Sequence, residues 1–164
     1  MNKNIASAFE NKKAFIGFVT AGDPDLDTSR QILLEMAKNG CDLIEVGIPF
    51  SDPIAEGPVI QEANIRALAQ GVTTDKVFDL VAEISAQIDI PLVFMTYLNV
   101  LFRYGYDRFC RRAADSGISG VIVPDLPYEE KHELSDVAKK NGIAVISLVC
   151  LLYTSDAADD RISV

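Results

Sequence analysis

Five short apolar segments, each rich in β-branched residues, recur along the chain and constrain its fold more than any other feature. They are typical of buried strands: Phe15–Thr20 (FIGFVT), Leu43–Gly47 (LIEVG), Leu92–Tyr97 (LVFMTY), Gly120–Pro124 (GVIVP) and Ala144–Val149 (AVISLV). Helical patterns lie between them, at Asp27–Lys38, Pro58–Gln70, Thr74–Ala86, Tyr106–Asp115 and Glu129–Lys140. Strands that alternate with helices predict βα units and a parallel sheet.

The junction between helix and strand is repeated in the chain. Three predicted helices end in a small polar residue plus glycine and run directly into a strand: NGCDLIEVG, SGISGVIVPD and NGIAVISLV. Glycine at this position adopts the left-handed conformation that ends many helices. The repeat supports one βα unit after another.

Two architectures contain such units, a doubly wound open sheet and a (β/α)8 TIM barrel. No GxGxxG or P-loop follows the first strand, which disfavours a nucleotide-binding open sheet. Functional-looking residues lie in or just after the carboxy-terminal halves of several strands, where barrel enzymes keep their catalytic groups: Thr20–Pro24, Glu45, Tyr97–Asn99 and Asp125. A barrel typically takes about 250 residues. We therefore expect an α/β fold, a TIM barrel truncated after about five strands, with residues 1–149 forming the partial barrel domain.

The last fifteen residues, CLLYTSDAADDRISV, differ in composition and show no clear helix–strand continuation. They resemble the translated adaptor or vector sequence found at the end of truncated reading frames. We expect residues 150–164 to be a tail that is not native to the domain.

The charge and cysteine content exclude several classes of protein. A net charge of −9 and a pI of about 4.5 argue against binding to nucleic acid or an anionic membrane. A phosphorylated substrate stays possible, because helix N-termini bind phosphate through backbone N–H groups. Three widely spaced cysteines form no disulfide framework or CxxC pair. With no signal-peptide pattern and no apolar run of membrane-spanning length, we expect a cytoplasmic protein.

Glu45 stands in the middle of a predicted buried strand. Side chains alternate along a strand, so Glu45 shares a face with Leu43 and Gly47. The other face is wholly apolar and suits packing on helices: Ile44, Val46 and Ile48. Glu45 is therefore expected to point into the barrel, where burial raises the pKa of a carboxyl and fits it for proton transfer. The alternative is a structural Glu that pairs with a Tyr or Lys and fixes the strand register.

Glu56 lies in the next loop, SDPIAEGP, which proline and glycine stiffen. A loop after the second strand lies over the barrel mouth, so Glu56 is placed to reach a substrate above Glu45. The alternative is an ordinary solvated loop carboxylate.

Four motifs carry a family resemblance: GFVTAGDPD, LIEVGIPFSDPIAEGPVIQEANIRAL, MTYLNVLFRYG and GVIVPDLPYEE. From about Ala14 to Val149 the chain resembles the tryptophan synthase alpha chain family. The resemblance implies a lyase of L-tryptophan biosynthesis that cleaves indole-3-glycerol phosphate to indole and glyceraldehyde 3-phosphate by a retro-aldol reaction. It implies no cofactor on this chain. The implied partner is a beta chain that carries pyridoxal phosphate, in an α2β2 tetramer.

The resemblance also implies roles for particular residues. Glu45 matches the catalytic general acid/base, and Glu56 matches a second catalytic carboxylate that accepts a hydrogen bond from the indole N–H. Glu56 departs from the family pattern, which has Asp there; we interpret the extra methylene as tolerated. The implied substrate-binding positions are Phe18, Thr20, Met95 and Tyr97. The loops that hold phosphate in the family are not found here, so we expect little activity from these 164 residues alone.

Two other functions stay open. One is another phosphate-binding barrel such as indole-3-glycerol phosphate synthase, although no Lys occupies the five predicted strands, where that family has a catalytic Lys. The other is a non-catalytic subunit that binds a beta chain. We expect His132, Arg103 and Lys140 to lie on the surface.

Overall fold

The computed structural model describes residues 3–10 and 12–148. Five parallel strands form one sheet in the sequential order β1-β2-β3-β4-β5. They are β1 (Ile16–Thr20), β2 (Leu43–Gly47), β3 (Leu92–Met95), β4 (Ile118–Ile122) and β5 (Ala144–Ile146). A doubly wound sheet reverses its strand order at a switch point. The uninterrupted order is therefore the one that the barrel predicts, and the α/β class is confirmed.

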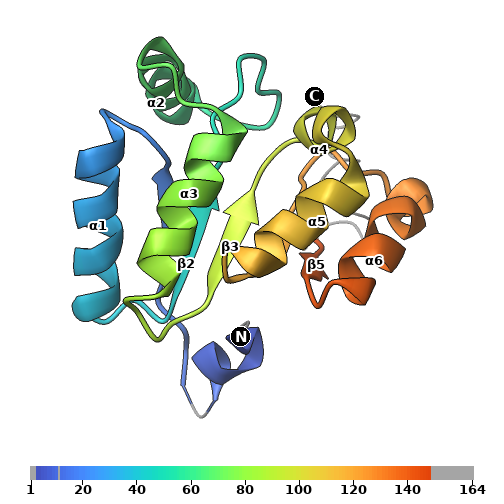
Figure 1. The fold of residues 1–164 in the computed structure, drawn as a ribbon, viewed down its shortest axis with the longest axis horizontal. Coiled ribbons are helices and arrows are strands. Elements are labelled where there is room, and N and C mark those ends of the chain that lie inside the picture. Colours follow the sequence, from blue (N-terminus) through green and yellow to red (C-terminus); the bar gives the residue numbers. More distant parts are fainter. Residues whose placement is uncertain (1–2, 11, 149–164) are drawn as a thin grey trace.

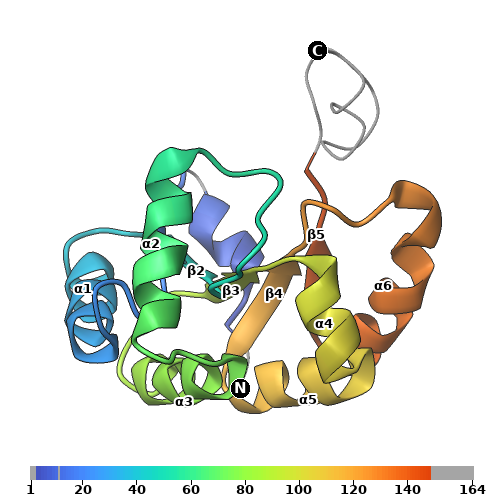
Figure 2. The same ribbon diagram turned by 90° about the horizontal axis from the view of Figure 1, so that it is seen from above.

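Helices cover one face of this curved sheet. The α-helices are α1 (Leu26–Lys38), α2 (Pro58–Ala69), α3 (Thr74–Ser85), α4 (Leu98–Tyr104), α5 (Tyr106–Asp115) and α6 (Lys131–Lys140). Two 3₁₀-helices are η1 (Ile5–Phe9) and η2 (Tyr128–Glu130). Figure 1 and Figure 2 show α1, α3, α5 and α6 along the outer face, with η1 on the opposite, inner face. Helices α2 and α4 lie at the end where the strands finish (Figure 1).

The predicted helix–strand junctions are confirmed. Gly40, Gly117 and Gly142 all have positive φ, at 97°, 83° and 71°. Each therefore takes the backbone conformation that L-residues with a side chain rarely adopt. The three glycines end α1, α5 and α6 and turn the chain into the strand that follows.

The largest hydrophobic core lies between the sheet and its outer helices. At its centre Phe78 of α3 packs on Phe94 of β3 and Phe109 of α5, with ring centroids 5.4 and 5.2 Å away. All three side chains are fully buried. Ile44 and Val46 of β2 belong to this core, as the alternation of the strand predicts.

A smaller apolar cluster lies on the inner face. Leu43, Val93 and Ile122, from β2, β3 and β4, pack there with Ala8 of η1. The short helix η1 was not predicted, because five residues carry too little periodicity to show a helix. It covers part of the face that holds Glu45.

The boundaries of four strands differ from the sequence prediction: β1 begins one residue later, at Ile16, and β5 ends earlier, at Ile146. Strand β3 ends at Met95 and β4 runs from Ile118 to Ile122, two residues earlier than predicted. Helix α4 was missed because the apolar run LVFMTYLNVLF shows no break between strand and helix. The break is made by a tertiary contact: the Asp125 carboxylate accepts a hydrogen bond from the Leu98 N–H, at 2.8 Å. The predicted tail, 150–164, lies outside the described residues.

We expect Phe78→Ala to lower the free energy of unfolding by about 3–5 kcal/mol, because it empties the centre of the aromatic cluster. Phe78→Leu, which leaves a smaller cavity, should cost less. Phe102→Ala is the matched control, since Phe102 is 71% exposed and should change stability by no more than about 0.5 kcal/mol. Urea unfolding followed by circular dichroism measures all three; equal losses for Phe78 and Phe102 would contradict this packing.

Candidate active site

Glu45 lies on the inner face of β2, as predicted. Its neighbours on β2 alternate: Ile44 and Val46 belong to the helix-side core, whereas Leu43 belongs to the inner cluster. In the sheet register Glu45 lies between Phe18 of β1 and Val93 of β3. The carboxyl is thus flanked by an aromatic ring and an aliphatic side chain.

Burial raises the pKa of the half-buried Glu45 carboxyl above its ordinary value. Burial is the only cause, since within residues 3–10 and 12–148 no side chain forms an ion pair or hydrogen bond with this carboxyl. The alternative interpretation, a Glu paired with a Tyr or Lys to fix the register, is therefore not supported among the described residues. A carboxyl of raised pKa can both donate and accept a proton near neutrality.

Two residues further along each strand, towards its carboxy-terminal end, the inner face carries a second set of neighbouring residues. Register places Thr20, Gly47 and Met95 side by side on β1, β2 and β3. A Cβ at Gly47 would lie 2.7 Å from the Phe18 ring, so the glycine leaves the room that this ring occupies. The sheet thereby brings together four of the six predicted site residues: Phe18, Thr20, Glu45 and Met95.

The other two, Glu56 and Tyr97, meet in the loop between β2 and α2. Tyr97 is 3% exposed and forms the N-cap of α4. Its hydroxyl accepts a hydrogen bond from the Ala55 N–H at 3.0 Å and also bonds to the Glu56 carboxyl. Its ring packs on Phe50, with centroids 5.2 Å apart. Tyr97 thus fixes both the backbone and the carboxyl of this loop.

Glu56 is half-buried rather than solvated, so the alternative interpretation of an ordinary loop carboxylate does not hold. Asn64 of α2 donates a hydrogen bond from Nδ2 to Oε2 of Glu56, at 2.8 Å. Burial raises the pKa of Glu56, and the hydrogen bonds from Asn64 and Tyr97 oppose that rise because they favour the ionised form. The predicted site residues thus form two groups with one carboxyl each: Glu45 has no hydrogen bond from the described side chains, and Glu56 has two.

Asn64 is a site residue that the sequence analysis missed. It is 4% exposed and shares the buried face of α2 with Ala63 and Ala67. A signal was present, because Asn is a poor helix former and is seldom buried in a helix interior. His132, Arg103 and Lys140 are exposed, as predicted.

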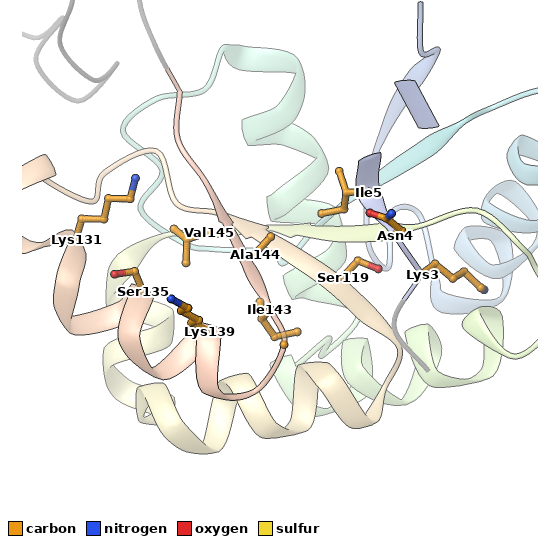
Figure 3. Close-up of a pocket in the computed structure, with 11 residues that line it drawn as sticks. Lys3, Asn4, Ile5, Ser119, Lys131, Ser135, Lys139, Ile143, Ala144 and Val145 are labelled. Atoms are coloured by element: carbon orange, nitrogen blue, oxygen red, sulfur yellow. The ribbon is translucent and has the colours of Figure 1, made fainter. Parts of the chain in front are cut away.

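A separate cavity lies away from these residues. A space of about 590 Å³ opens along β5 and α6, and Figure 3 shows it lined by Lys3, Ser119, Lys131 and Lys139 among others. Two of these lysines already have partners: Lys3 donates to the Ser85 carbonyl and Lys131 to the Ser147 hydroxyl. None of the six predicted residues lines this cavity. It lies along β5 and α6, away from these six residues, so we do not assign it to the candidate site.

Residues 3–10 and 12–148 lack two other kinds of feature. This part of the chain has no group of three or more His, Cys, Asp or Glu arranged to hold a metal ion. Its helices include none with the length and apolar character needed to cross a membrane.

Comparison with known proteins gives one consistent family. The family model described as tryptophan synthase alpha chain matches residues 5–163. The tryptophan synthase alpha chain of Petrotoga mobilis is 51% identical over 145 residues, which are 88% of this chain and 56% of that protein. That of Lacticaseibacillus casei is 48% identical over 145 residues, 88% of this chain and 54% of that protein. The chain spans about half the length of these relatives.

Solved structures agree with the fold. The alpha subunit of tryptophan synthase from Legionella pneumophila superposes with a TM-score of 0.86 at 40% identity, covering 92% of this chain and 59% of that one. A chain of the tryptophan synthase α2β2 complex from Pyrococcus furiosus superposes with a TM-score of 0.77 at 39% identity, covering 80% of this chain and 56% of that one. These neighbours are TIM barrels, so the predicted barrel fold is confirmed over the part that this chain spans.

We expect Glu45→Gln to stabilise the fold at pH 7.5 by about 1 kcal/mol, the scale of a poorly compensated buried polar group. The folded state raises the pKa of Glu45, so ionisation opposes folding. The stability that protonated Glu45 contributes is therefore fully present below the pKa that Glu45 has in the unfolded chain. It is lost as pH rises through the raised pKa of Glu45 in the folded state. The stability gained by Glu45→Gln should vanish below about pH 4, because Glu45 is then protonated in both the folded and the unfolded state. Urea unfolding at the two pH values measures it, with the exposed Glu62→Gln as control; a gain that is the same at both would contradict the desolvated carboxyl.

Proposed function

The chain belongs to the tryptophan synthase alpha chain family, and from this we propose that it provides the catalytic carboxyls for retro-aldol cleavage of indole-3-glycerol phosphate. The products are indole and glyceraldehyde 3-phosphate. The observation that supports this most directly is Glu45: a half-buried carboxyl of raised pKa on the inner face, next to Phe18. The proposed location of the protein is the cytoplasm.

Glu45 is the proposed general acid/base. Cleavage needs a proton delivered to the indole ring carbon that carries the glycerol chain. It also needs a proton removed from the adjacent hydroxyl, which becomes the aldehyde as the carbon–carbon bond breaks. One carboxyl of raised pKa can serve both transfers, because the rise brings its two protonation states closer in free energy. The reaction needs no metal or organic cofactor on this chain.

Glu56 is the proposed acceptor for the indole N–H. As the ring carbon is protonated, positive charge develops on the indole nitrogen, and a fixed carboxylate nearby stabilises that charge. The hydrogen bonds from Asn64 and Tyr97 favour the ionised form that this role requires. The difference in surroundings between Glu45 and Glu56 thus agrees with two different tasks.

The proposed indole pocket is formed by the inner face around Glu45. Phe18 and Met95 are half-buried there, and Thr20 lies at the strand end. A flat aromatic substrate gains from contact with an aromatic ring and a flexible thioether side chain. Phe18, Met95, Thr20 and Tyr97 are the residues that we propose contact the substrate.

The proposed partner is a beta chain that binds at the end of the barrel where the strands finish. Exposed apolar side chains gather on the loops and helices of this end: Ile54, Val59, Phe102 and Tyr128, at 58–76% exposure. Apolar and aromatic side chains in such numbers are typical of protein interfaces. The Pyrococcus furiosus α2β2 complex, in which a similar chain takes part, supports the pairing.

Of the alternatives, indole-3-glycerol phosphate synthase loses support, since the five strands of the structure contain no Lys. A non-catalytic subunit is distinguished by assay. Joined to the carboxy-terminal part of the Petrotoga mobilis relative, the chain should release indole from indole-3-glycerol phosphate.

In this joined protein we expect Glu45→Gln to lower kcat about 10²–10⁴-fold, because it removes the group that moves the proton. Glu56→Ala should cost about 10²-fold through lost charge stabilisation, and Glu56→Asp should retain most of the activity. Colorimetric indole release measures all three, with the exposed Glu62→Gln as control. A folded joined protein that releases no indole, with or without beta chain, would reject the lyase in favour of a binding subunit.

We expect Phe102→Asp to weaken binding of a purified tryptophan synthase beta chain by about tenfold or more, since it places a charge in a proposed apolar contact. Phe15→Asp is the matched control: Phe15 is 64% exposed but precedes β1, at the other end of the strands. Calorimetric titration of the 164-residue chain measures both. Equal effects of the two substitutions would place the interface elsewhere.

A further inference from the structure

The amide of Asn64 makes a contact that the proposed reaction does not by itself require. Asn64 lies in the second turn of α2, on the helix face that packs towards the sheet, and only 4% of it is exposed. A buried amide in a helix interior is costly unless its hydrogen bonds are made. Its Nδ2 donates a hydrogen bond to Oε2 of Glu56, at 2.8 Å.

Glu56 is tied to α2 by its backbone as well. Nε2 of Gln61 donates to the Glu56 carbonyl at 2.7 Å, and Gly57, directly after Glu56, is the N-cap of the helix. The Tyr97 hydroxyl holds the preceding residue, Ala55. With the backbone fixed on both sides, the remaining freedom of Glu56 lies in its three side-chain torsions.

We propose that Asn64 is a positioning residue, whose amide fixes one carboxylate oxygen of Glu56 so that the other is presented to the N–H of the substrate. The inference rests on the proposed function for the identity of that N–H donor. A glutamate has one more rotatable bond than an aspartate, so a second anchor removes orientations that would otherwise have to be lost on binding. Asn64 supplies this anchor from a rigid helix rather than from the loop.

The hydrogen bond also bears on the charge of Glu56. Two side chains act on the Glu56 carboxyl, Asn64 from α2 and Tyr97 from the N-cap of α4, and both are neutral donors. Within the described residues no charged side chain is among the causes that shift the pKa of this carboxyl. The pKa of Glu56 is therefore set by burial, which raises it, and by the hydrogen bonds from Asn64 and Tyr97, which lower it, and not by an ion pair.

The test is the titration of Glu56 in the 164-residue chain, followed by the ¹³C signal of its side-chain carboxyl, with Glu56→Gln to assign the signal. Asn64→Leu replaces the amide by an apolar group of similar volume. We expect the titration midpoint of Glu56 to move up by about one pH unit, the size expected for loss of one hydrogen bond to an ionised group. The midpoint of Glu45, which Asn64 does not contact, is the internal control and should not move.

Asn64→Ser is the second variant, in case Leu is not tolerated at this position. Its hydroxyl is too short to reach Oε2, so it should give the same upward shift with the fold intact. A Glu56 midpoint that stays unchanged in a folded variant would overturn the role of Asn64. The titration uses no substrate, so that outcome is independent of the lyase assay. A shifted midpoint in a protein that releases no indole would instead reject the proposed function and leave the Asn64–Glu56 contact standing.

Discussion

The packing of one face of the sheet on four helices is the constraint on which the rest of the structure depends. Strands β2 and β3 give their larger outer side chains, Ile44, Val46 and Phe94, to that core. The inner face is then free to carry other chemistry, and Glu45 lies there without a charged partner among the described residues. A strand can keep a carboxyl in its middle because its apolar contacts are made on the other side.

The second carboxyl is positioned by different means. Glu56 lies in a loop, where no sheet register fixes it, and its position comes from three side chains on two elements, α2 and the start of α4. Tyr97 and Gln61 hold the backbone on either side, and Asn64 holds the carboxyl itself. This division suits the proposed reaction, since Glu45 must exchange protons while Glu56 must stay charged.

The sequence predicted the periodic parts of this fold well. Strand β2 has the predicted bounds, and the three glycines that end helices all have the predicted positive φ. The sequence prediction failed where an element is short, or where its boundary is set by a contact with a residue far away in the sequence. Helix α4 begins where Asp125, from the loop after β4, caps Leu98, and no local pattern around Leu98 contains that information.

The sequence by itself determined the alternation of βα units, the two faces of β2 and the family to which the chain belongs. These depend on local periodicity and on motifs, which are properties of neighbouring residues. Only the tertiary structure decided that Glu56 is held by Asn64 and Tyr97, since these residues stand 8 and 41 positions away in the chain, as their numbers show. Such contacts follow from how helices and strands pack, and packing depends on the whole chain.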